Sequence, residues 1–218
     1  RLHVRRVACD IAGVNRWFNI AGPCFPQEHY MIPPERRAVE AVQLLEHGGW
    51  VSLVAGRQTG KTTALQTLAR TVSQPNGRLV LWVDLEVARG NPLLADTMRL
   101  ILRAIDLALL SDAPGVSRPS SAELEELLRS PGDALQRYLS ALCAAVGHPV
   151  VLLFDEADVL VGEAMVSFLT QLRASYLGRH RQAAPHCVVL AGVKAVRDYA
   201  TGDDDRDRLR WLGTASPF

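Results

Sequence analysis

Short apolar runs alternate along the chain with longer segments in which apolar residues recur every three or four positions. The apolar runs are rich in β-branched and aromatic residues, which is typical of buried strands, and they lie at residues 50–55, 79–84, 150–154 and 187–193. The helical spacing predicts helices at about residues 34–47, 62–72, 91–109, 120–128, 133–146 and 162–177. Strands that are apolar on both faces and separated by helices indicate a parallel sheet covered on both sides. The predicted fold class is therefore α/β, a three-layer αβα sandwich with a mainly parallel sheet.

A glycine-containing segment, AGRQTGKTT at residues 55–63, lies directly between a predicted strand and a predicted helix. It matches the pattern A/G-x-x-x-x-G-K-T, in which backbone N–H groups and the positive end of a helix hold phosphate oxygens. Gly60 allows a close backbone approach, Lys61 supplies charge for the β- and γ-phosphates, and Thr62 supplies a hydroxyl ligand for Mg²⁺. Thr63 is expected at the α-phosphate. The predicted nucleotide-binding residues of this loop are Ala55, Gly56, Arg57, Gln58, Thr59, Gly60, Lys61, Thr62 and Thr63.

An acidic pair, Asp155 and Glu156, follows the apolar run VVLLF. Ligands in parallel sheets bind at the carboxyl ends of the strands, so this pair is expected beside the phosphate loop. Asp155 is expected to hold Mg²⁺ through water together with Thr62, and Glu156 to polarise the attacking water. Glu156 and Lys61 are therefore the predicted catalytic residues, with ATP and Mg²⁺ as cofactors. Asp158 is interpreted as a local cap or a group behind the site rather than a direct ligand.

The letters D-E-A-D at residues 155–158 also name a family of RNA helicases. Those helicases need a Ser-Ala-Thr motif on the following strand and a second motor domain with an arginine motif. The following strand here reads VVLAGVKAVRD, and about 60 residues follow Asp155. We therefore expect the acidic pair of an ATPase, followed by Ala and Asp, and not a helicase signature.

The composition of the chain argues against several functional classes. Basic and acidic residues number 24 and 23, giving a net charge of +1, so no overall basic surface for nucleic acid or an anionic membrane is expected. No apolar run approaches about 18 residues, which argues against a membrane span. The four cysteines form no CxxC pair, and a reducing, cytoplasmic location is expected. The chain carries no Asn-Lys-x-Asp motif of the kind that reads guanine, which favours ATP over GTP.

From about Arg16 to Phe218 the chain resembles the AAA-like P-loop ATPases of bacteria, close to the AAA+ and STAND groups. The resemblance rests on RWFNIAGPCFPQEHYMIPPERR, AGRQTGKTTAL, VVLLFDEADVLVG and VVLAGVKAVRDY. It implies the sheet type with an additional strand and a catalytic glutamate. It also implies a core at residues 16–218 without its C-terminal lid, preceded by an extension at residues 1–15.

The resemblance further implies the positions of auxiliary residues. Tyr30 and Ile32 are expected to contact adenine, with a simple loop anchor as the alternative. The strand at 187–191 is expected between the phosphate-loop strand and the acidic-pair strand, with a sensor residue beyond its end. AAA+ proteins usually place Asn, Thr or Ser there, whereas this sequence offers Lys194 and Arg197 as candidates. The candidates for an arginine finger are Arg206, Arg208 and Arg210.

Two functions from different classes fit these residues. The first is Mg²⁺-dependent ATP binding and hydrolysis coupled to conformational change, which Glu156 favours. The second is a STAND-like nucleotide-controlled switch or scaffold with little turnover, which the unclear sensor favours. A DNA-associated ATPase similar to origin-recognition and loader proteins would need a winged helix, and a small-molecule kinase an acceptor lid, and neither is evident. The expected partners are ATP and either a second copy of the chain or another protein, with no nucleic acid or membrane indicated.

Overall fold

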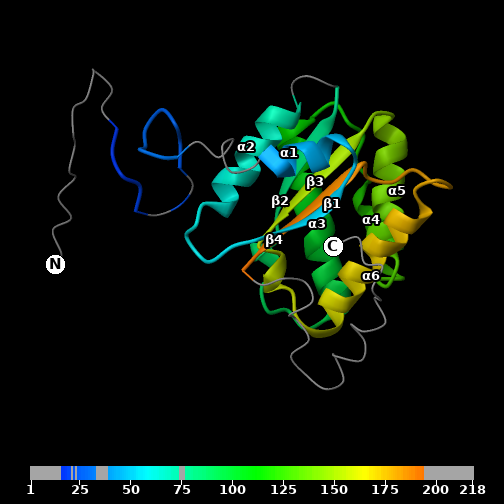
Figure 1. Ribbon diagram of the computed structural model, residues 1–218. Coiled ribbons are helices and arrows are strands. Elements are labelled where there is room, and N and C mark those ends of the chain that lie inside the picture. The colour runs from blue at the N-terminus through cyan, green and yellow to red at the C-terminus, as the bar shows by residue number, and fades with distance from the viewer. Residues whose placement is uncertain (1–15, 21, 23, 33–38, 74–76, 194–218) are drawn as a thin grey trace.

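The computed structural model describes residues 16–20, 22, 24–32, 39–73 and 77–193, with the backbone alone described at 39–42 and 71–73. At its centre is a four-stranded, all-parallel sheet in the order β1-β4-β3-β2 (Figure 1). The strands are β1 (Trp50–Val54), β2 (Leu79–Asp84), β3 (Val150–Asp155) and β4 (Cys187–Gly192). The α/β prediction is confirmed, as is the place of the last strand between the phosphate-loop strand and the acidic-pair strand.

Helices cover both faces of the sheet (Figure 1). On one face lie α1 (Val39–Glu46) and α2 (Lys61–Ser73). On the other face lie α3 (Leu94–Asp112), α5 (Ala134–Val146) and α6 (Gly162–Gly178). The short α4 (Ser121–Leu128) packs against α3 and α5, and the 3₁₀ turns η2 (Glu86–Ala88) and η3 (Ala157–Val159) follow β2 and β3.

Alternating side chains on the strands divide the core into two layers. In β2, Leu79 and Leu81 pack into the layer with α3, α5 and α6, whereas Val80 packs with Leu45 of α1 and Leu65 of α2. The central strands β3 and β4 are buried at all six of their positions. A fully buried valine or leucine contributes about 1.5–3 kcal/mol relative to an exposed one, so these two strands anchor the fold.

The predicted strand ends are correct to within one residue, but the predicted start of α3 at Asn91 is wrong. The helix begins at Leu94 because Asn91 forms a turn of its own. Its side-chain oxygen accepts a hydrogen bond from the backbone N–H of Leu93 at 3.0 Å, and its carbonyl accepts one from the Thr97 hydroxyl at 3.1 Å. The helix then runs to Asp112, three residues past its predicted end at 109.

A capping box begins α4, since the backbone N–H of Glu123 donates to the Ser120 hydroxyl and the Glu123 side chain accepts from the Ser120 N–H. The predicted helix start at Pro34 lies outside the described residues, as does the expected extension at residues 1–15. Within the described part of the chain, no helix combines the length and apolarity needed to cross a membrane.

One buried side chain joins α6 to the start of α5. Gln171 of α6 is 2 % exposed, and its Oε1 accepts hydrogen bonds from the backbone N–H groups of Leu135 at 2.7 Å and Gln136 at 3.2 Å. Its Nε2 donates to the carbonyl of Pro131 at 2.9 Å. The residue preceding α5, Asp133, makes no side-chain cap, so Gln171 supplies the cap from a different helix.

We expect Gln171→Leu to lower the free energy of unfolding by about 2–4 kcal/mol, because it leaves buried backbone donors without acceptors. The measurement is urea unfolding followed by circular dichroism. Gln182→Leu, at an exposed position, serves as the matched control and should change stability by less than about 0.5 kcal/mol. Equal, small effects of both substitutions would contradict the capping role of Gln171.

Candidate functional site

The segment between β1 and α2 forms an exposed turn. Residues 56–60 are exposed, and the Thr59 hydroxyl donates to the carbonyl of Gly56 at 2.8 Å across the turn. Gln58, with a φ of 58°, and Gly60, with a φ of 89°, have left-handed backbones. A Cβ on Gly60 would meet no atom within 4 Å, so the conformation and not crowding favours glycine there. Left-handed residues of this kind turn neighbouring backbone N–H groups into an anion-binding nest.

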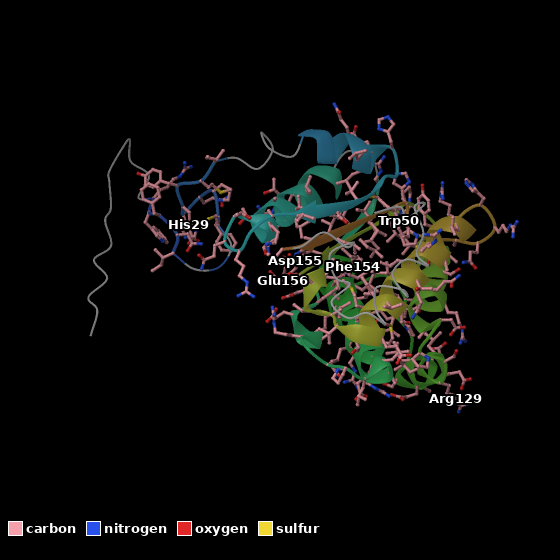
Figure 2. All side chains as sticks on the ribbon, turned by 60° about the horizontal axis from the view of Figure 1, so that its bottom comes forward. His29, Trp50, Arg129, Phe154, Asp155 and Glu156 are labelled. Carbon is pink, nitrogen blue, oxygen red and sulfur yellow. The ribbon has the colours of Figure 1, made fainter. Side chains whose placement is uncertain are left out.

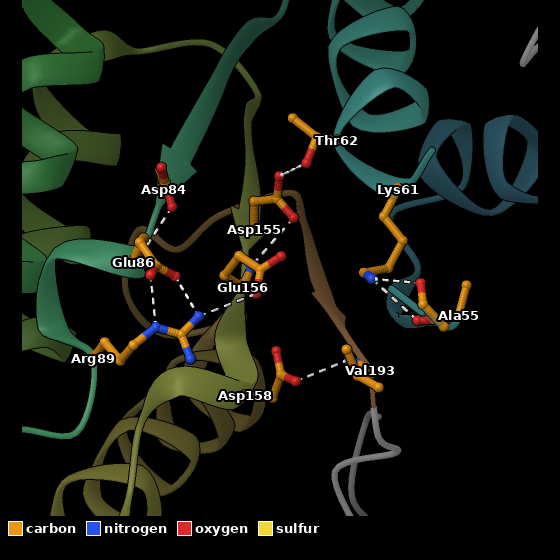
Figure 3. Close-up of polar contacts among 11 residues, drawn as sticks. Ala55, Lys61, Thr62, Asp84, Glu86, Arg89, Asp155, Glu156, Asp158 and Val193 are labelled. Carbon is orange, nitrogen blue, oxygen red and sulfur yellow. Dashed lines mark hydrogen bonds and ion pairs between the residues drawn. The ribbon is translucent and has the colours of Figure 1, made fainter. Parts of the chain in front are cut away.

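Lys61 begins α2, and its ammonium group lies against this turn (Figure 3). Nζ donates to the backbone carbonyls of Ala55 and Gly56, both at 3.0 Å. The side chain is only 8 % exposed, so the stem packs against protein while the charged end is held by the loop. The positive charge expected to meet phosphates is therefore in place beside the turn.

A hydrogen bond joins the two sequence motifs at the carboxyl ends of the strands (Figure 3). The Thr62 hydroxyl donates to Oδ2 of Asp155 at 2.6 Å, although 93 positions separate the two residues. Oδ1 of Asp155 accepts the backbone N–H of Glu156 at 3.0 Å, and the side chain is 2 % exposed. Figure 2 shows Asp155 and Glu156 at the end of the sheet opposite Trp50, where β1 begins. The predicted pairing of the phosphate loop with the acidic pair is thus present in the geometry.

Glu156 has a strained backbone and lies among other charged side chains. Its φ of 53° is left-handed, which costs a residue other than glycine about 1–2 kcal/mol. Burial raises the pKa of its carboxyl, and the carboxylates of Asp158 and Asp155 raise it further, whereas Lys61 lowers it. The side chain retains 34 % of its exposure, so water can reach this carboxyl.

An arginine that was not predicted from the sequence lies beside this carboxylate. Arg89, which follows η2, lies 3.7 Å from Oε2 of Glu156 and donates two hydrogen bonds to Glu86, at 2.6 and 2.5 Å (Figure 3). The Arg89 hydrogen bond lowers the pKa of the Glu86 carboxyl. A signal was available in the sequence, because Asp84 closes the neighbouring strand β2 and pairs in register with Asp155. Polar residues shortly after that strand therefore lie at the same end of the sheet as Asp155.

Asp158 links the acidic turn to the next strand. Its Oδ2 accepts the backbone N–H of Val193, just beyond β4, at 3.1 Å (Figure 3). Asp158 therefore holds the backbone just beyond a neighbouring strand and does not cap its own turn, as a local cap would. The sensor candidates Lys194 and Arg197 lie outside the described residues, as do the arginine-finger candidates Arg206, Arg208 and Arg210.

A hydrogen bond joins the N-terminal segment to the start of α2, from the backbone N–H of Cys24 to the hydroxyl of Thr63 at 3.1 Å. Thr63 is 9 % exposed, so this hydroxyl already has a protein partner. Tyr30 packs against Phe18 with 5.1 Å between ring centroids, and Ile32 is 62 % exposed. Their contact with adenine stays a prediction, as does the contact of Thr63 with the α-phosphate.

The strained backbone at Glu156 can be tested with two substitutions that both remove its carboxylate. Glycine normally makes a protein about 0.5–1 kcal/mol less stable than alanine. At residue 156 we expect Glu156→Gly to be at least as stable as Glu156→Ala in urea unfolding, because only glycine relieves the left-handed conformation. The control pair is Glu163→Gly and Glu163→Ala in the first turn of α6, where glycine should be the less stable. The same glycine penalty at both positions would contradict strain at Glu156.

Comparisons with known proteins complete this description. Residues 44–199 match the family model described as an AAA domain. A solved structure of Drosophila ORC bound to DNA contains a similar chain, with 17 % identity over 80 % of this chain and 84 % of that chain, and a TM-score of 0.38. A comparison with curated proteins finds no match. Since the family model covers well over half of the sequence, the chain belongs to the AAA domain family of P-loop ATPases.

Proposed function

We propose that this protein is an Mg²⁺-dependent ATPase that couples hydrolysis to a conformational change. The observation that carries the proposal is the Thr62–Asp155 hydrogen bond, because it holds a hydroxyl, a carboxylate and the adjoining Glu156 beside the loop that bears Lys61. Membership of the AAA family supports nucleotide binding in general. Hydrolysis requires, in addition, a group that can activate water, and Glu156 is the candidate.

We assign phosphate binding to the turn between β1 and α2. Its exposed backbone N–H groups, with the N-terminal end of α2, favour an anion. Lys61 would exchange the carbonyls of Ala55 and Gly56 for phosphate oxygens when nucleotide binds. In this proposal Tyr30 and Ile32 lie near the base. The loop residues proposed to contact nucleotide are Ala55, Gly56, Arg57, Gln58, Thr59, Gly60, Lys61, Thr62 and Thr63.

The donor set at Thr62 and Asp155 fits Mg²⁺, which prefers hydroxyl, carboxylate and water oxygens. Thr62 would hold the ion directly, and Asp155 would hold it through water, with both oxygens already within hydrogen-bond distance of each other. The ion would neutralise charge on the phosphates. Asp155 is buried, and hydrogen bonds from the N–H of Glu156 and the hydroxyl of Thr62 keep its carboxylate in one orientation.

Glu156 is proposed as the general base for the attacking water. Its raised pKa makes the carboxylate a stronger base than an exposed glutamate, and its partial exposure admits water. Asp158 suggests how turnover is coupled to motion, because it ties the acidic turn to the backbone at Val193. The sensor candidates Lys194 and Arg197 follow immediately in the sequence.

A nucleotide-controlled switch with little turnover is the second candidate, and the ion pair between Arg89 and Glu156 favours it. An arginine 3.7 Å from Oε2 competes with water for this carboxylate, which would leave Glu156 less free to orient an attacking water. In either function we propose a protein partner or a second copy of the chain, and we do not propose a nucleic acid. We place the protein in the cytoplasm because Cys24, Cys143 and Cys187 are free thiols.

Hydrolysis is tested by ATP turnover and ATP binding measured on the same samples. We expect Glu156→Gln to lower kcat by about 10²–10⁴-fold while binding is retained, because the amide cannot accept the proton. Lys61→Met should weaken ATP binding by about 10–100-fold, because a charged donor to phosphate is lost. Glu163→Gln, an exposed change on α6, is the control and should leave both measurements unchanged.

Equal turnover by wild type and Glu156→Gln would remove Glu156 from the mechanism. Tight ATP binding without turnover in either protein would instead support the switch.

The metal site is tested by titrating Mg²⁺ into ATPase assays of Thr62→Val and Thr62→Ser. Valine keeps the shape of threonine but lacks the hydroxyl, so the Mg²⁺ concentration for half-maximal rate should rise by about 10–100-fold. Serine keeps the hydroxyl and should behave like wild type within about threefold. If valine and serine give the same Mg²⁺ dependence, the hydroxyl of Thr62 does not hold the ion.

A further inference from the structure

Strand β2 forms one edge of the sheet, with its outer side unpaired within the described part of the chain. The N–H of Leu79 donates to the carbonyl of Pro149 at 3.0 Å, and the N–H of Leu85 donates to the carbonyl of Asp155 at 3.1 Å. Backbone groups of a parallel strand face its neighbour at every second residue, so the odd-numbered residues of β2 face β3. The N–H and C=O groups of the even-numbered residues 80, 82 and 84 therefore point away from the sheet.

This edge lacks the usual protection against pairing. Natural edge strands are commonly interrupted by proline, lysine or a bulge, which prevents another strand from adding to them. Residues 79–83 read LVLWV and contain none of these residues, and β2 pairs with β3 in unbroken register over its six residues. No described residue outside the sheet donates to or accepts from the outward backbone groups. The strand can therefore accept an extended segment.

A hollow of about 500 Å³ lies alongside β2 on the face covered by α2. Val80 and Trp82 form its side on the strand, and Gln66 and Arg70 form its side on α2. Arg78 closes it before β2 begins, and Asp112, at the end of α3, completes the rim. Side chains of a segment added to β2 would alternate in direction, so every second one would point into this hollow.

The hollow carries hydrogen-bond donors without acceptors. The Nε1–H of Trp82 and Nη1 of Arg78 are buried, and neither has a partner among the described residues. The other terminal nitrogen of Arg78, Nη2, is held by the carbonyl of Glu46 at 3.3 Å, which orients the guanidinium. Unpaired buried donors are unfavourable, so an acceptor supplied from outside would be bound with a gain in free energy.

The charge around the hollow favours an acidic ligand. Arg70 is exposed in the last turn of α2, and Arg78 lies at the start of β2, whereas Asp112 is the single acidic residue in the lining. A carboxylate beside either arginine gains attraction and can accept the free hydrogen bonds. We propose that β2 is a docking edge for an extended, acidic segment of a partner protein, which pairs with the strand backbone and places carboxylates beside Arg70 and Arg78.

A peptide fits this surface better than a nucleic acid. Arginines and an indole can also bind phosphates and bases. However, the most regular feature of the surface is the row of outward N–H and C=O groups, which match the backbone of an extended peptide about five residues long. Affinity would then come from main-chain pairing, and the preference for acidic side chains from the two arginines.

The test uses the whole 218-residue chain and three labelled heptapeptides, with binding followed by fluorescence anisotropy. The first peptide alternates glutamate and valine, the second replaces glutamate by lysine, and the third is the acidic peptide N-methylated at every residue, so that neither of its edges can donate to a strand. A short oligothymidine provides a nucleic-acid probe. The same samples are examined by hydrogen exchange, which reports protection of residues 79–85.

We expect the acidic peptide to bind and to slow exchange in β2, and the lysine and N-methylated peptides to bind at least tenfold more weakly. Arg70→Glu and Arg78→Glu should weaken the acidic peptide about tenfold, because attraction becomes repulsion. Trp82→Phe keeps the ring packing but removes the donor, so it should weaken binding by about threefold to tenfold. Arg181→Glu, an exposed change outside the hollow, is the charge control and should have no effect.

Several outcomes would overturn the proposal. These are no binding of the acidic peptide, equal binding of the N-methylated peptide, or exchange protection away from β2. Tighter binding of oligothymidine that depends on Arg70 and Arg78 would assign the surface to nucleic acid. A dimer in sedimentation that buries β2 and excludes the peptide would make a second copy the occupant. ATP binding, measured on each variant, should match wild type and thereby establishes that the variants are folded.

Discussion

The hydrogen bond between Thr62 and Asp155 is the interaction on which the site depends. It can form only because β4 inserts between β1 and β3, which sets the separation between the loop that precedes α2 and the acidic turn that follows β3. The buried central strands fix that separation, since their side chains fill both layers of the core. Hydrophobic packing of the parallel sheet thus positions a few polar atoms at the carboxyl ends of its strands.

Polar and strained groups gather at the carboxyl ends of the strands, whereas the strands themselves consist mainly of apolar residues. Four carboxylates, those of Asp84, Glu86, Asp155 and Glu156, lie at the last residues of β2 and β3 or just beyond them, and Arg89 forms ion pairs with Glu86 and Glu156. The left-handed residues Gln58 and Glu156 lie at the two turns that meet there. Such features reduce stability locally and persist because the surrounding core is well packed. The clustering of these groups distinguishes this end of the sheet as the candidate functional site.

The parts of the structure that could be predicted from sequence are those encoded by local patterns. Apolar runs located the four strands of the described residues, and the spacing of Gly60, Lys61 and Thr62 predicted a phosphate-binding turn between β1 and α2. Contacts of residues that belong to neither motif with distant parts of the chain could not be predicted. Arg89 reaches Glu156 only through the pairing of β2 with β3, and Cys24 reaches Thr63 through the path of the N-terminal segment. The start of α3 was misplaced because a side-chain turn at Asn91 competes with helix formation, which helical periodicity alone does not reveal.

The Gln171 cap has a consequence for how the chain folds. The N-terminal amides of α5 obtain their acceptor from a residue about 35 positions later in the sequence, so the first turn of α5 gains this stabilisation only when α6 is docked. A helix of 13 residues gains little from its own hydrogen bonds, and its stability comes mainly from such tertiary contacts. Loosening of α6 would therefore release the start of α5 as well. The cap therefore makes the stability of one helix depend on that of the other.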